Sequence, residues 1–99
     1  MSGPLQAFTS LYDAITESKS ISLVVTSDSP AHMLLTGAER DLTLAEELLA
    51  AQDATGALKL VENAMGMLVL TAGLGEEDLI EEALTHAEDA HESISSLLR

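Results

Sequence analysis

The chain has 99 residues, of which 46% are hydrophobic, and carries 17 acidic residues against four basic ones, for a formal net charge of −13. This length supports one hydrophobic core but not two, so we expect a single domain spanning residues 1–99. The negative charge repels phosphate groups and anionic lipid, which argues against direct nucleic-acid binding and against membrane binding. The absence of cysteine excludes disulfides, thiol nucleophiles and cysteine metal sites.

Two features predict a soluble, cytoplasmic protein. Residues 1–4 lack the basic segment and apolar core of a secretory signal. The longest apolar stretch, residues 65–74, is shorter than the roughly 20 residues that a membrane-spanning helix needs. The aromatic content of 2% argues against a deep small-molecule pocket and favours helices packed through leucine, isoleucine, methionine and alanine.

The first predicted helix runs from about residue 4 to residue 17. Pro4 suits a first helical turn, and apolar residues recur after it at helical spacing. Residues 21–26 form the only β-favouring segment. A single strand cannot satisfy its own backbone, so this segment extends the helix, pairs across an oligomer or packs as extended chain. The helical extension is the favoured alternative.

A second helix is predicted from Pro30 to about residue 52, because Ser27, Asp28 and Ser29 supply capping side chains just before a proline. Gly37 lies inside this helix and is a possible kink. The third helix is predicted to start after Asp53 as its cap and to run to residue 74, where glycines end it.

The third helix is apolar on nearly all sides, which is typical of a bundle centre or a subunit interface. Its expected core face is Leu58, Val61, Ala64, Met65, Leu68 and Ala72. A second stripe, made of Leu60, Met67 and Leu70, is the predicted oligomer interface. Because a small bundle cannot cover both stripes, we expect a homo-oligomer, most simply a twofold dimer.

The last helix is predicted to start at the acidic residues 76–78, where the helix dipole favours negative charge. Its expected apolar stripe is Leu79, Ile80, Ala83, Leu84, Ala87, His91, Ile94 and Leu98. The pattern as a whole predicts an all-α protein, a small bundle of about four helices.

Eight of the 17 acids lie between residues 76 and 92, with no lysine or arginine among them. Two interpretations remain open: a solvated face that serves solubility or tolerance of high salt, and a surface that meets a basic partner. The predicted partner-binding residues are Glu77, Asp78, Glu81, Glu82, Glu88, Asp89 and Glu92. The favoured function is binding, sequestering or inhibiting a basic protein without catalysis or a cofactor. A structural assembly subunit is the alternative.

A metal-dependent enzyme is ranked last. Glu82 with His86, and Glu88 with His91, have helical spacing that suits a shared ligand. The two histidines are five residues apart, however, or roughly 140° around a helix, so one ion cannot readily take both. We therefore predict no metal site, and interpret His91 as a packed histidine with one satisfied nitrogen.

Overall fold

A computed structural model describes residues 3–99, so Met1 and Ser2 lie outside the described residues. The described residues are helical apart from short turns, and no strand occurs among them. The elements are α1 (Gly3–Ser22), α2 (Pro30–Ala50), α3 (Ala54–Thr71), a π-helical turn η1 (Ala72–Glu76) and α4 (Glu77–Leu97). The prediction of an all-α protein is confirmed.

The predicted count of about four helices is not confirmed, because α3, η1 and α4 follow one another as one helical stretch that is bent at a single non-helical residue, Gly75. The structure therefore has three continuous helical stretches between residues 3 and 99, and the third folds back on itself. Gly75 makes this reversal with a φ of 103°, a left-handed conformation that glycine adopts readily.

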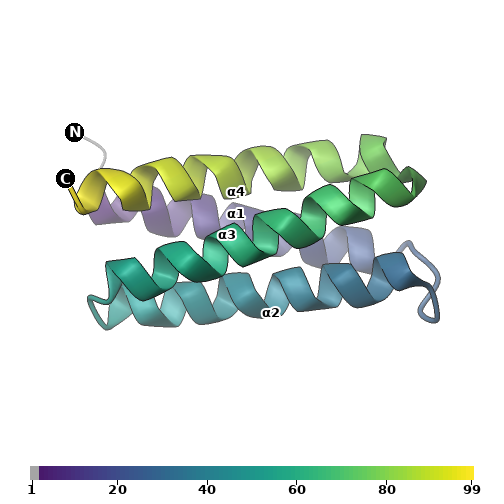
Figure 1. Cartoon of the computed structure of the whole chain (residues 1–99), viewed down its shortest axis with the longest axis horizontal. Helices are drawn as coiled ribbons and strands as arrows, with labels where there is room; N and C mark the ends of the chain where they lie inside the picture. The colour runs from purple at the N-terminus through teal and green to yellow at the C-terminus, as the bar shows by residue number, and fades with distance from the viewer. Residues whose placement is uncertain (1–2) are drawn as a thin grey trace.

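Helices α1, α2, α3 and α4 lie side by side, each antiparallel to the one before it, as a bundle-like arrangement (Figure 1). α1 packs on α4 and α2 packs on α3, while α1–α2 and α3–α4 contacts close the arrangement. The molecule measures 38 × 20 × 18 Å. The described chain ends lie at one end of the bundle, and η1 and the α1–α2 loop lie at the other (Figure 1).

Each helix buries residues spaced alternately three and four apart, the pattern of helices that cross at shallow angles. In α2 this pattern alternates alanine with leucine, as Ala31, Leu35, Ala38, Leu42, Ala45 and Leu49. α3 repeats it with Ala57, Val61, Ala64, Leu68 and Thr71. Alanine fills many of the inward positions, and several large apolar residues, Leu70 and Leu74 among them, remain outside the core.

The helix starts agree with their predicted caps. The Ser29 side chain accepts a hydrogen bond from the His32 backbone N–H, and the Asp53 side chain accepts one from Gly56. Gly37 does not interrupt α2. It is buried against α3, where an added Cβ would lie 2.9 Å from the Met67 Sδ.

The other boundaries differ from prediction. α1 continues to Ser22 rather than stopping at residue 17, so the favoured helical extension holds for residues 21 and 22. Residues 23–26 do not continue the helix: they leave it through a turn in which the Val24 N–H donates to the Ile21 carbonyl at 3.0 Å. α3 ends at Thr71 and not at residue 74, because the chain enters η1 there.

Two predicted core faces are rotated from their observed positions. On α3 the buried face includes Thr71, while Leu58 and Met65 are only partly buried. On α4 the predicted stripe residues Leu79 and Leu98 are exposed. The buried residues of α4 are Ile80, Ala83, Ala87, Ala90, Ser93 and Ile94. The buried residues that were not predicted are small: Ala57 and Thr71 on α3, and Ala90 and Ser93 on α4.

Candidate protein-interaction surface

The outward side of α4 carries the acidic residues singled out from the sequence. All seven are exposed: Glu77, Asp78, Glu81, Glu82, Glu88, Asp89 and Glu92. They face away from the buried Ala83, Ala87 and Ala90, because helical periodicity places them on the opposite side. The surface is therefore rigid, acidic and open to a partner.

These carboxylates are not neutralised within the protein. Among residues 3–99, no lysine or arginine nitrogen lies within 4.0 Å of a carboxylate oxygen. The negative charge is thus available to attract a positively charged surface.

A groove between α4 and α1 hollows one edge of this surface. It contains a cavity of about 340 Å³ lined by Gln6, Asp89, Glu92, Ser93 and Ser96. Two of the predicted partner-binding residues, Asp89 and Glu92, therefore meet an amide and two hydroxyl groups. This combination offers several acceptors to a lysine ammonium or an arginine guanidinium.

Further acidic residues follow the groove residues at helical spacing on both helices. Asp13 and Glu17 follow Gln6 by seven and 11 residues, so they lie within about 20° of it around α1. On α4, Glu82 and Asp78 precede Asp89 by the same intervals. α1 and α4 run antiparallel in contact (Figure 1), so helical spacing places both sets of acids on the side of the α1/α4 pair where the groove opens.

The histidines do not assemble a metal centre. The Nε2 atom of His91 lies 3.0 Å from the Glu62 Oε2 atom of α3, so its partner is on another helix and is not Glu88. His86 is half-buried on α4. Across the described residues 3–99, no three histidine or carboxylate side chains converge as metal ligands would.

The predicted oligomer stripe is divided by the fold. Leu60 and Met67 are partly buried against the core of their own chain. Leu70, in contrast, is 61% exposed, with Val69 and Leu74 exposed beside it. The exposed large apolar residues of α3 and η1 are therefore Val69, Leu70 and Leu74, displaced toward η1 from the predicted stripe.

One helical segment of the described chain, Ala54–Leu97, is long and apolar enough to match a membrane-spanning helix in length and composition. Its most apolar 18-residue window has a mean hydropathy of 1.3, and 28% of that window is buried. A core helix of a soluble protein meets the same criterion, so this finding is weak evidence for a membrane. The low buried share does show how much apolar surface this part of the protein exposes.

No family model matches this chain, and no curated protein or solved structure is significantly similar to it. Function is therefore inferred from the surface of the protein itself.

Sequence reasoning missed the contribution of α1 to the acidic groove. The intervals of seven and 11 residues between Gln6, Asp13 and Glu17 are visible in the sequence and place the three on one side of a helix. What the sequence does not show is that this side borders α4. That information comes only from the packing order of the helices.

Proposed function

We propose that this protein binds a basic protein partner through the acidic surface of α4 and the adjoining α1/α4 groove, without catalysis. The observation that carries the proposal is the set of seven exposed α4 carboxylates, which have no lysine or arginine partner among residues 3–99. Asp13 and Glu17 add to this charge from α1. Complementary charge of this kind accelerates association and selects among partners.

The groove supports a partner that presents lysine or arginine side chains on a defined surface. Its cavity, lined by Asp89 and Glu92, offers a basic side chain two carboxylates at a hollowed surface instead of a flat one. A protein that sequesters or inhibits a basic macromolecule fits this arrangement, and so does a chaperone for one.

Charge reversal tests the proposal. Glu81→Lys with Glu88→Lys changes the net charge from −13 to −9, since each substitution adds two charges. Glu39→Lys with Glu47→Lys makes the same change on α2, which packs mainly on α1 and α3. The immobilised protein and both variants are used to capture basic proteins from extracts of its own source, at about 0.15 M salt.

We expect the α4 variant to lose its partner and the matched variant to retain it, because the two differ only in where the charge is changed. Equal loss in both variants would show that attraction depends on net charge alone. Retention in both would refute the role of α4.

An assembly subunit is the second candidate, and the exposed Val69, Leu70 and Leu74 favour it. In this case the acidity serves solubility, and the apolar patch joins copies of the chain. Light scattering of the purified protein at low and high salt tests this candidate. A dimer that Leu70→Ser dissociates supports it, and a monomer under both conditions rejects it.

A further inference from the structure

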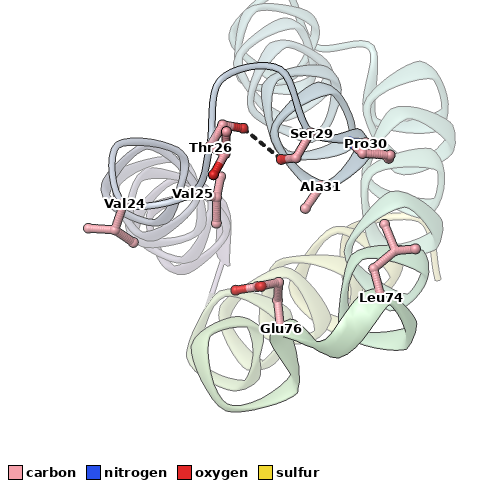
Figure 2. A pocket seen from close by; sticks show the side chains of 8 residues that line it. All are labelled: Val24, Val25, Thr26, Ser29, Pro30, Ala31, Leu74 and Glu76. Atoms are coloured by element: carbon pink, nitrogen blue, oxygen red, sulfur yellow. Dashed lines mark hydrogen bonds between the residues drawn. The ribbon is translucent and has the colours of Figure 1, made fainter.

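A hollow of about 320 Å³ lies at the η1 end of the bundle, where three separate segments meet. Its lining comes from the α1–α2 loop, the start of α2 and η1: Val24, Val25, Thr26, Ser29, Pro30, Ala31, Leu74 and Glu76. In Figure 2, the Val25, Ala31 and Glu76 side chains point toward the centre of the hollow, and Val24 points away. The walls present polar and apolar area in similar amounts, and Glu76 supplies the one ionisable side chain of the lining.

Glu76 has an unusual position for a carboxylate. It is the N-cap residue of α4, yet its side chain makes no capping hydrogen bond. It is half-buried, and no lysine or arginine of the described chain pairs with it. The carboxylate is therefore turned from the helix that it begins toward the hollow, where it lacks a positive partner.

The start of α2 does not convert the hollow into an anion site. Three of the first four residues of α2 offer no free backbone N–H to a ligand. Pro30 has no N–H. The N–H groups of His32 and Met33 donate to the Ser29 hydroxyl at 3.2 Å and to the Ser29 carbonyl at 3.3 Å. A carboxylate facing the same space repels anions further. The electrostatics of the hollow favour a cation.

The hollow is also held in shape by contacts between its segments. The His32 ring nitrogen Nδ1 lies 3.1 Å from the Ser22 carbonyl oxygen, linking the end of α1 to the start of α2. The Ser29 hydroxyl donates to the Thr26 carbonyl at 2.6 Å across the loop (Figure 2). A site whose walls are fixed before binding loses less conformational freedom when it is filled.

We propose that this hollow binds an alkylammonium group, with the hydrocarbon chain against Val25, Pro30 and Leu74 and the ammonium beside Glu76. In a protein this group is the lysine side chain, whose apolar stem packs on apolar surface while its charged end reaches a polar one. The lysine belongs to the basic partner, and this assignment rests on the proposed function. Glu76 leads directly into the acidic start of α4, so one partner reaches both surfaces.

The probe is n-butylammonium chloride, which has the four-carbon chain and the ammonium of lysine, and n-butanol is its neutral counterpart. Methyl NMR resonances of Val25, Ala31 and Leu74 report on binding, at constant ionic strength. So small a ligand binds weakly, with a Kd on the order of 10 mM. We expect the ammonium to half-saturate these shifts at about three- to fivefold lower concentration than the alcohol, the contribution of one partly exposed charge pair.

Glu76→Gln should remove this preference for the ammonium, while Glu47→Gln, which removes the same charge from the far part of α2, should retain it. Two results would overturn the site: equal binding of amine and alcohol by the unmodified protein, or equal effects of the two substitutions. The first comparison needs no variant, so it stands even if a substitution perturbs the fold.

The partner assignment has its own test. If the partner's lysine occupies the hollow, Glu76→Gln weakens partner capture about three- to fivefold. Amine binding without this weakening would show that the partner's lysine is not the occupant. Failure of the proposed function is distinct, because it would appear as partner capture that survives reversal of Glu81 and Glu88.

Discussion

Ser18 provides the sharpest test of the core. Its side chain is fully buried on α1, and its hydroxyl oxygen has no hydrogen-bond partner. A buried polar group without a partner costs about 1–3 kcal/mol relative to its hydrated state in the unfolded chain. Ser18→Ala removes this cost and adds about 0.5 kcal/mol of helix propensity.

Ser18→Ala also leaves a void the size of one oxygen atom, which lowers the gain in unfolding free energy by about a few tenths of a kcal/mol. We therefore expect a net stabilisation of about 1–2 kcal/mol. For a chain of this size, each kcal/mol raises Tm by about 4–8 °C. Urea unfolding followed by circular dichroism measures the free energy, and a thermal scan provides the shift in Tm. An unchanged m-value would show that the denatured state is unaffected.

Ser20→Ala is the matched control, because Ser20 is exposed two residues further along α1. It changes propensity alone and should shift stability by at most about 0.5 kcal/mol. Equal effects of the two substitutions, or destabilisation by Ser18→Ala, would refute the reasoning. The second result would mean that the Ser18 hydroxyl has a partner inside the folded protein.

Three further predictions concern the turn after α2, the α3–α4 contact and the net charge. Gln52 has a φ of 66°, a left-handed conformation that is unfavourable for a residue with a side chain. Gln52→Gly should therefore raise the free energy of unfolding in urea by about 0.5–1 kcal/mol, and a lower value would contradict the prediction. Glu62→Gln removes the charge from the partly exposed contact with His91 and should lower stability by less than about 1 kcal/mol, with Glu47→Gln as the control that lacks such a partner. The acidic side chains that give the net charge of −13 repel one another in the folded protein. Raising NaCl from about 0.02 M to 0.5 M should therefore increase Tm, and a salt-independent Tm would indicate that the charges are already screened.

The helices were predictable because their signals are local. Ser29 before Pro30, and Asp53 before Gly56, cap their helices through contacts three residues away, which the sequence displays directly. The extent of α1 was less accessible. Residues 21–26 favour strand by composition, and packing of Ile21 into the core retained only the first part as helix.

The core faces were harder to predict because hydrophobicity and burial do not coincide in this protein. Leu79 and Ile80 have side chains of the same size and were both expected to face the core, yet Ile80 is buried and Leu79 is exposed. The choice depends on which sides of α4 the neighbouring helices cover. Single-helix periodicity contains no information about that arrangement.

The candidate site divides in the same way. The exposed α4 acids follow from charge and helical period, so their positions were accessible from the sequence. The η1 hollow was not, because Val25, Ala31 and Glu76 come from three segments that meet only after the chain has reversed at Gly75. The acidic groove required the pairing of α1 with α4 for the same reason.

Alanine-rich packing and net charge together favour a basic partner over a second copy of this chain. Large residues such as Leu70 and Leu74 remain outside the core, where they offer apolar area to any protein that reaches them. Association of two copies would bring two charges of −13 together, and this repulsion opposes binding most strongly at low salt. A basic protein gains from the same field. Added salt should therefore strengthen any self-association and weaken binding of the basic partner. Whether affinity rises or falls with salt thus distinguishes a second copy of the chain from a basic protein on the apolar surface.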